Sequence, residues 1–234
     1  MRRKQDCYLQ EEVVVEGASM VYFDVLGVKI DQVTEKQALD IVADWVNSKK
    51  KRYIVTLNME FVMLAQKDEE FKKILNQADL AICDGAGLRL ADRRLIRVSG
   101  VDLMLSLIKQ GYKTVLVGGK PGVAQKAAKM TRSNLVIGMM EPEMEKINKI
   151  KPDLLFVALG MGKQEKWIAK NLPKLDVKVA MGVGGALDQI VKPWLRAPKW
   201  VQNLGLEWLW RLMVQPWRIK RQWQLVRFLA KIYL

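Results

Sequence analysis

Short apolar segments alternate with longer amphipathic segments along most of the chain. The short segments are rich in Val, Ile and Leu, which is typical of strands in a sheet that is buried on both faces. The first of them, VYFDVLGVKI at 21–30, is predicted to be a strand or a hairpin. Further strands are predicted at 52–58, 79–83, 114–119, 134–138, 153–160 and 177–185.

The segments between these strands carry apolar residues at the spacing of a helix with one buried face. Thr34 and Gln37 have the spacing of a capping box at the start of the first such segment. Because strands alternate with helices, we expect a doubly wound α/β domain, with a mostly parallel sheet and helices on both faces. This core is predicted to span residues 20–195, after a flexible leader at 1–19.

The pattern changes near the C-terminal end, where residues 196–234 are predicted to form an appendage of two or three helices. Residues 204–224 read LGLEWLWRLMVQPWRIKRQWQ and contain four tryptophans. In the last helix an apolar stripe and a polar stripe each recur at steps of three or four residues. The apolar stripe is Ile219, Trp223, Val226, Leu229 and Tyr233, and the polar stripe is Lys220, Gln224, Arg227 and Lys231.

Positive charge is concentrated in the same part of the chain. The net charge of the 234 residues is +14, and residues 192–234 hold nine Lys or Arg against one acid, Glu207. Six of the eight tryptophans lie there as well. A basic, tryptophan-bearing amphipathic helix is typical of the membrane interface, where its cations meet lipid phosphates. We therefore expect the appendage to bind an anionic membrane surface.

Two other roles of the appendage remain open. An amphipathic terminal helix is more often part of a core or an oligomer interface, so a homo-oligomer is one alternative. Arginine and aromatic residues also suit stacking on nucleic-acid bases. However, the apolar stripe is continuous and the sequence has no recognised nucleic-acid motif, so no nucleic-acid partner is expected. No stretch approaches the roughly 18 uninterrupted apolar residues of a membrane-spanning helix.

The composition excludes several kinds of chemistry. The chain has no histidine, so Ser-His-Asp, Cys-His and His–metal sites are ruled out. Its two cysteines give no disulfide framework, and Cys83 is predicted to be a buried thiol in a protein of the reducing cytoplasm. The GxGxxG fingerprint, the P-loop motif and a DxD pair are all missing. We therefore expect neither a cofactor nor a metal ion.

In a doubly wound sheet, ligands bind beyond the carboxyl ends of the strands. Asp84 follows a predicted strand and is either a general base in a cleft or a turn residue. Thr56 and Asn58 follow another strand and either line the site or cap the next helix. Gly184 and Gly185 form a tight turn or bring backbone amides to a phosphate.

Two further polar residues lie near these strand ends. Gln164 is either a site residue or a residue in the first turn of a helix. Arg97 is either a site residue or a solvated surface charge. The residues alone leave both alternatives open.

Several stretches together resemble the WecG/TagA/CpsF glycosyltransferases, also called glycosyltransferase family 26. They are TLNMEFVMLAQKDEEF, DLAICDGAGL, RVSGVDLM, DLLFVALGMGKQEKWI, GVGGALD and RAPKWVQNLGLEWLWRLMVQPWRIKRQ, and they cover about residues 20–225. The resemblance implies an α/β enzyme that moves a sugar from a UDP-sugar to a polyprenyl-diphosphate-linked sugar, with inversion and without metal. Its members act at the cytoplasmic face of the membrane in teichoic acid, capsule and related polysaccharide synthesis.

The resemblance also implies roles for single residues. Asp84 in CDGAG matches the proposed catalytic base, and Thr56 and Asn58 match residues that line the sugar or the diphosphate. The other matches are Arg97 and Gln164 toward the donor, Gly184, Gly185 and Asp188 on the nucleotide side, and Arg211, Arg218 and Arg221, which close over the site and meet phosphates.

The chain departs from the family's pattern at two positions near the expected donor loops. Gly162 stands where proline usually precedes KQE, and Lys192 stands where a glycine usually follows GALD. These changes bear on the identity of the sugar more than on the reaction. The sequence and the resemblance together predict an inverting UDP-sugar transferase, specific for N-acetylmannosamine or a related hexose, that is peripheral on the inner face of the cell membrane. The alternative is a non-catalytic, membrane-associated partner of polysaccharide assembly.

Overall fold

The computed structural model describes residues 10–15, 18–203, 206–216 and 219–233. Within these residues the strands form one nine-stranded sheet in the order β1-β2-β3-β5-β4-β9-β8-β6-β7. The first three strands pair antiparallel, and every other pair is parallel. The strands are β1 (Gln10–Val15), β2 (Ala18–Val25), β3 (Val28–Asp31), β4 (Arg52–Leu57), β5 (Leu80–Cys83), β6 (Thr114–Gly118), β7 (Val136–Met139), β8 (Leu154–Ala158) and β9 (Val179–Gly182).

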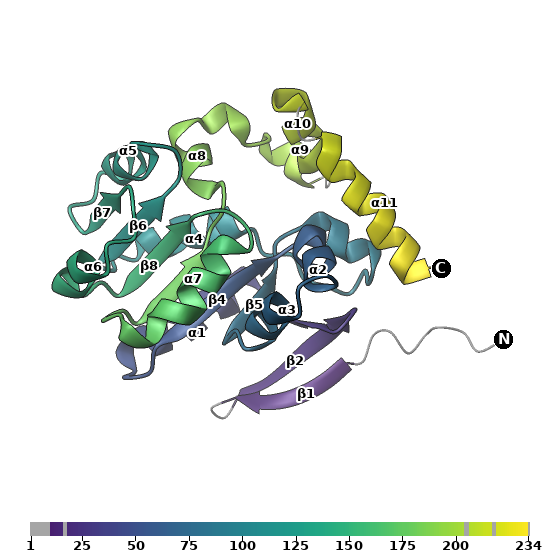
Figure 1. Ribbon diagram of the computed structural model, residues 1–234, viewed down its shortest axis with the longest axis horizontal. Helices are drawn as coiled ribbons and strands as arrows, with labels where there is room; N and C mark the ends of the chain where they lie inside the picture. The colour runs from purple at the N-terminus through teal and green to yellow at the C-terminus, as the bar shows by residue number, and fades with distance from the viewer. Residues whose placement is uncertain (1–9, 16–17, 204–205, 217–218, 234) are drawn as a thin grey trace.

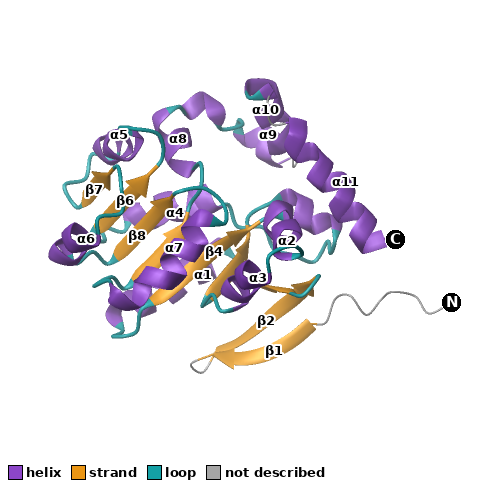
Figure 2. Ribbon diagram, in the orientation of Figure 1, coloured by secondary structure: helices purple, strands orange, loops and turns teal. Residues whose placement is uncertain are grey.

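Helices cover both faces of this sheet (Figures 1 and 2). Side chains alternate along each strand, so Val55 and Leu57 of β4 belong to one hydrophobic core and Ile54 to the other. The first core includes residues of α2 (Met59–Ala65), α3 (Glu69–Asn76), α6 (Met144–Ile150) and α7 (Lys163–Asn171). The second includes residues of α1 (Glu35–Asn47), α4 (Gly100–Lys109), α5 (Val123–Met130) and α8 (Ala186–Val191). The predicted doubly wound α/β fold is confirmed.

The start of α1 shows how local sequence sets an element. The Gln37 amide donates to Thr34 Oγ1 at 3.2 Å, and the Thr34 amide donates to Gln37 Oε1 at 2.8 Å. This is the predicted capping box, which satisfies two backbone donors that the first helical turn leaves unpaired. Ala38, Val42 and Trp45 recur at helical spacing and form the buried face of the helix.

The N-terminal leader differs from the prediction of a flexible segment up to residue 19. Residues 10–15 form β1, and residues 18–19 begin β2. The two strands pair antiparallel from Gln10 opposite Phe23 onwards, at the edge of the sheet. The apolar run of β1 is only three valines long, so its pattern was too short to predict a strand, although β-branched residues favour one.

The C-terminal residues form the predicted helices, which are α9 (Lys199–Asn203), α10 (Glu207–Val214) and α11 (Ile219–Tyr233). α11 runs back over the core and packs along α2 (Figure 1). Phe228 and Ile232 on this face are buried. Most of the predicted apolar stripe instead faces solvent, with exposed side chains at Ile219, Trp223, Val226 and Tyr233. α11 therefore has two apolar faces, and the sequence analysis had found only the outer one.

Candidate active site

A cavity of about 650 Å³ lies at the carboxyl ends of β4, β5, β8 and β9. The appendage closes part of it, because residues of α10 and α11 contribute to its wall. The loop after β6, at Gly118–Gly119, does not line it, although this strand end also carries glycines. The predicted site residues that line the cavity are Thr56, Asn58, Asp84, Arg97, Gln164, Gly184, Gly185 and Arg211.

Asp84 lies directly after β5, half-buried in the cavity wall. Its Oδ1 accepts a hydrogen bond from the Gly100 amide at 2.8 Å. Gly100 is needed there, since a Cβ at this position would lie 2.9 Å from Thr56 Cγ2. Burial raises the pKa of the Asp84 carboxyl, and the Gly100 amide, Arg211 and Arg97 only partly oppose this rise. The carboxyl is therefore fixed in orientation and is a stronger base than an exposed aspartate.

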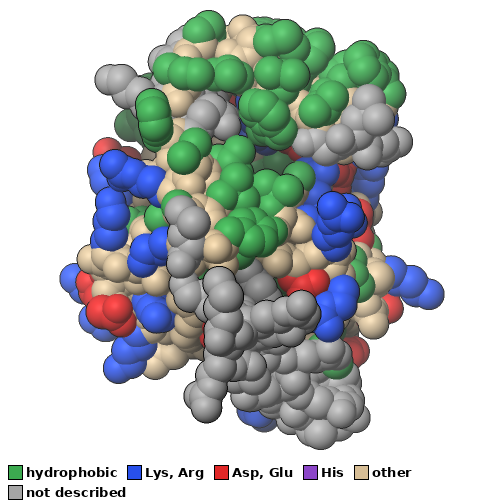
Figure 3. Space-filling model, turned by 90° about the vertical axis from the view of Figure 1, so that its right-hand side faces the viewer, with side chains coloured by type: hydrophobic (Ala, Val, Ile, Leu, Met, Phe, Trp, Pro, Cys, Tyr) green, Lys and Arg blue, Asp and Glu red, His purple; other side chains and the backbone are tan. Residues whose placement is uncertain are grey.

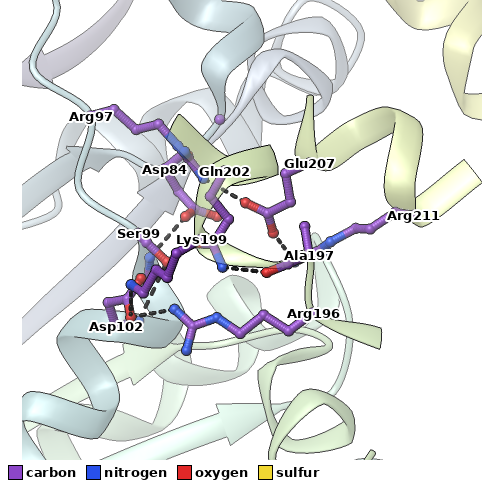
Figure 4. A network of polar contacts seen from close by, with 12 residues as sticks. Asp84, Arg97, Ser99, Asp102, Arg196, Ala197, Lys199, Gln202, Glu207 and Arg211 are labelled. Atoms are coloured by element: carbon purple, nitrogen blue, oxygen red, sulfur yellow. Dashed lines mark hydrogen bonds and ion pairs between the residues drawn. The ribbon is translucent and has the colours of Figure 1, made fainter. Parts of the chain in front are cut away.

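A chain of charged groups connects Asp84 to the appendage (Figure 4). Arg97 Nε donates to the Asp84 carbonyl oxygen at 2.9 Å, and its Nη2 meets Glu207 Oε2 at 2.6 Å. Glu207 Oε1 in turn meets Arg211 Nη2 at 2.8 Å. Arg97 is thus a cavity residue with 21% of its side chain exposed, and not a solvated surface charge. The sequence analysis had not identified Glu207 as a site residue, although it is the one acid in residues 192–234.

Thr56 and Asn58 hold the end of β4 in place. Thr56 is buried and its Oγ1 donates to the Gly182 carbonyl oxygen at 3.2 Å, which ties β4 to β9. Asn58 Oδ1 accepts from the amides of Glu60 at 2.8 Å and Phe61 at 3.3 Å. Asn58 therefore caps α2, as one of the two sequence interpretations held, and it also lines the cavity.

Gln164 fixes the loop after β9. It is buried, its Nε2 donates to Glu165 Oε1 at 2.6 Å, and its Oε1 accepts from the Gly184 amide at 3.0 Å. The Gly184 amide is therefore already paired, while the neighbouring Gly185 is exposed at the cavity. Burial raises the pKa of Glu165, despite its hydrogen bonds to Gln164 and to the amide of Gly162.

Gly162 explains one departure from the family's pattern. Its φ is +82°, in the left-handed region, at the N-cap of α7. The proline that usually stands there holds φ near −65°, so it is incompatible with this backbone. A proline at position 162 would therefore change the conformation of the loop between β8 and α7.

The remaining predicted residues are placed differently. Asp188 is half-buried in α8 and does not line the cavity. The next residue, Gln189, lines it instead, with 8% exposure and an Oε1 that has no hydrogen-bond partner among the described residues. Arg218 lies outside the described residues, and so does the side chain of Arg221.

A second charged cluster fixes the root of the appendage to α4. Asp102 accepts a hydrogen bond from the Arg196 guanidinium and lies 3.6 Å from Lys199 Nζ (Figure 4). Burial alone would raise the pKa of Asp102, but its contacts with Arg196, Ser99 and Lys199 together outweigh burial and hold the pKa below its usual value. The chain thus enters the appendage from a fixed point beside the cavity.

No membrane-spanning helix and no metal centre are found in the described part of the chain. None of the helices there is both long and apolar enough to cross a bilayer. No three His, Cys, Asp or Glu side chains there are grouped so that they could hold a metal ion.

Comparison with known proteins agrees with this architecture. The sequence model of the glycosyl transferase WecG/TagA/CpsF family matches residues 23–234. Proteins from Staphylococcus aureus strains MRSA252 and NCTC 8325 / PS 47 are 31% identical to the chain in a match that covers 94% of this chain and 95% of theirs. Both are named N-acetylglucosaminyldiphosphoundecaprenol N-acetyl-beta-D-mannosaminyltransferase. The chain therefore belongs to the WecG/TagA/CpsF family and is a glycosyltransferase.

Proposed function

We propose that the enzyme transfers N-acetylmannosamine or a related hexose from a UDP-sugar to a polyprenyl-diphosphate-linked sugar, with inversion and without a metal ion. The names of the Staphylococcus aureus relatives support the sugar and a lipid-diphosphate acceptor. The observation that carries the proposal is the Asp84 carboxyl in a cavity that also contains Arg97 and Arg211. Such a site offers a base together with guanidinium cations, which suits inversion at a sugar–diphosphate bond.

In the proposed reaction the acceptor hydroxyl oxygen attacks the anomeric carbon of the donor sugar. The bond from that carbon to the diphosphate oxygen breaks, and UDP departs with the electron pair. Asp84 takes the proton of the attacking hydroxyl, and its raised pKa suits this role at neutral pH. Its hydrogen bond to the Gly100 amide leaves the second carboxylate oxygen for the acceptor.

The departing diphosphate needs a cationic environment. Arg97 and Arg211 both line the cavity, and guanidinium groups bind phosphate oxygens in a bidentate geometry. Two arginines therefore provide the charge stabilisation that a divalent metal ion supplies in other transferases.

The acceptor's lipid would place the enzyme at a membrane surface. Exposed apolar side chains gather over the appendage, at the top of Figure 3. They include Trp200 of α9, and Trp208, Met213 and Trp223 of α10 and α11, the two helices that also contribute to the cavity wall. We propose that this surface binds the inner leaflet and that docking completes the site. Water then has less access to the UDP-sugar, so hydrolysis is limited.

The substitution Asp84→Asn tests the reaction. It should lower transfer by about 10²–10⁴-fold, as removal of a general base does, while UDP still binds. Transfer is measured with a panel of UDP-sugars and a short-chain prenyl-diphosphate sugar, with a chelator present, and product stereochemistry is read by NMR. Asp176→Asn is the matched control, because Asp176 is exposed and its ion pair with Lys151 lies away from the cavity. Unchanged turnover of the Asp84 variant, or a need for metal, would refute the proposal.

A further inference from the structure

The carboxylate of Glu207 occupies an unusual place for an acid. It is the one acidic residue in a segment, 192–234, that carries nine Lys or Arg. Only 18% of its side chain is exposed, and it lines the cavity that contains Asp84. Each of its two oxygens meets a different arginine, at 2.6 Å from Arg97 and at 2.8 Å from Arg211.

Local helix energetics explain only half of this arrangement. An acid in the first turn of α10 is favoured by the helix dipole, and a pair with Arg211 at i,i+4 stabilises an isolated helix slightly. Neither effect involves Arg97, which reaches Glu207 from the loop between β5 and α4. The carboxylate therefore bridges two cations that come from the core and from the appendage.

The chemistry of the bridge matches that of a phosphate. A carboxylate and a phosphate both present paired oxygens to guanidinium groups, so both fit the space between Arg97 and Arg211. Arg211 also has a buried Nε with no hydrogen-bond partner among the described residues. The cationic site thus has a donor to spare while Glu207 occupies it.

The charges around Arg97 and Arg211 determine whether a diphosphate can bind there while Glu207 stays in place. Arg97 and Arg211 carry two positive charges, the Glu207 carboxylate meets both of them, and the Asp84 carboxyl lines the same cavity. A diphosphate beside both carboxylates would meet two like charges within the same cavity, and like charges repel more strongly there than in bulk water. If Glu207 moves away, the same diphosphate meets two free guanidinium groups.

We infer that Glu207 is an internal stand-in for a sugar-linked diphosphate: it holds Arg97 and Arg211 in place while the subsite is empty, and the substrate's diphosphate displaces it. This inference rests on the proposed function. It assigns Glu207 as a positioning residue whose carboxylate competes with the substrate. Because Glu207 lies on α10, its displacement by the diphosphate also breaks the ion pair between the appendage and Arg97.

The test measures diphosphate affinity in the full-length protein by titration calorimetry. Glu207→Gln keeps the shape of the side chain and removes its charge, so the competition should weaken. We expect the variant to bind its diphosphate about tenfold more tightly than the wild type, which corresponds to about 1.4 kcal/mol. UDP and a short-chain prenyl diphosphate are titrated separately, so that tighter binding of one identifies the donor or the acceptor subsite.

Two controls make the result specific. Glu143→Gln removes a carboxylate from an exposed ion pair with Lys146 on α6, away from the cavity, and should leave both affinities unchanged. Arg211→Gln combined with Glu207→Gln should show less gain than Glu207→Gln alone, because one of the freed cations is missing.

The outcomes separate this inference from the proposed function. Equal or weaker diphosphate binding by a folded Glu207→Gln protein overturns the inference, because Glu207 would then merely support the arginines. If the wild type transfers sugar in that case, the proposed function stands alone. If neither protein binds either diphosphate and no transfer occurs, both proposals fall.

Discussion

At the scale of single residues, the site contains groups that lower stability. Burial of Asp84 raises its pKa, so the folded protein holds the proton more tightly than the unfolded chain does. The buried Oε1 of Gln189 has no hydrogen-bond partner among the described residues. Buried polar groups without a partner lower the free energy of unfolding unless a ligand pairs with them, and such groups are often found at functional sites.

The pH dependence of activity and of stability should report Asp84. As a base it must be ionised, so kcat/KM should rise with pH along an acid limb whose midpoint lies above the ordinary aspartate pKa. Stability should change with pH in the opposite direction to activity, because the pKa of Asp84 is higher in the folded protein than in the unfolded chain. Its contribution to the free energy of unfolding falls as pH rises from the unfolded-state pKa through the folded-state pKa.

At neutral pH the buried carboxylate of Asp84 lowers the free energy of unfolding, and Asp84→Asn removes this charge. The variant should therefore unfold at higher urea concentration than the wild type at pH 7, and the difference should shrink toward acid pH. Urea titrations across the pH range measure both effects. Identical pH slopes for the two proteins would contradict the assignment of a raised pKa to Asp84.

Gln189 should trade stability against affinity. Replacing it with methionine removes an unsatisfied buried acceptor at similar volume, so the free energy of unfolding should rise by about 1 kcal/mol. If a donor group of the substrate satisfies Oε1, the KM for the UDP-sugar should rise at the same time. Gln125→Met is the matched control, because its buried Oε1 also finds no partner in the described part of the chain, and Gln125 does not line the cavity. A KM that changes equally in both variants would argue against a contact with substrate.

At the scale of elements, α11 joins the appendage to the core by its inner face and leaves its outer face to solvent. Phe228 is completely buried against the core cluster that includes α2, whereas 68% of Trp223 is exposed. The helix therefore covers the cavity wall and still presents aromatic side chains outward.

Phe228→Ala should release α11 without unfolding the sheet. Loss of a buried phenyl ring typically costs about 3–5 kcal/mol of stability. Phe228 and Ile232 are the two buried side chains among the described residues of α11, so the loss of one should be enough to detach this terminal helix from the core. Hydrogen exchange should accelerate in α11 while the protection of β4 and β8 stays unchanged. Trp223→Ala should leave both unchanged, since exposed substitutions usually shift stability by less than about 0.5 kcal/mol. Uniform loss of protection in the Phe228 variant would show instead that α11 and the core unfold together.

At the scale of the whole molecule, the basic segment 192–234 and its exposed apolar side chains lie on the same side of the protein as the cavity. The appendage combines the basic segment with exposed tryptophans, and it walls the site. A surface of this kind suits an interface with an anionic bilayer, where indoles lie at headgroup depth.

Co-sedimentation with vesicles containing anionic lipid should depend on these tryptophans. Trp200→Ser with Trp223→Ser should lower binding by about tenfold or more, since each indole buries a large apolar area. Leu135→Ser, an exposed apolar residue before β7, is the control and should bind normally. Duplex and single-stranded DNA are tested in parallel. DNA binding that survives the tryptophan changes, without vesicle binding, would favour the nucleic-acid alternative.

Local sequence patterns were enough to predict most of the elements and the edge of the sheet where chemistry could occur. Short apolar runs and helical periodicity are local patterns, so they predicted most of the strands, the helices and the doubly wound sheet, and the spacing of Thr34 and Gln37 predicted the capping box. Because ligands bind at the carboxyl ends of parallel strands, the same patterns made Asp84 a candidate site residue, and the resemblance to the family matched it to the base. The buried thiol of Cys83 followed from the same reasoning and is confirmed, with burial raising its pKa to about 12.

Which side chains contact one another depends on how the elements pack, and local patterns could not predict it. The bridge of Glu207 between Arg97 and Arg211, the choice of Gln189 over Asp188 and the inner face of α11 all depend on how helices dock. A rotation of about 100° between neighbouring helical residues separates a side chain in the cavity from one outside it. Periodicity shows that a helix has a face, but the surface that this face meets lies far away in the sequence. For that reason the sequence could propose a base and a cationic cover, and only the packed chain could show how a carboxylate joins the two.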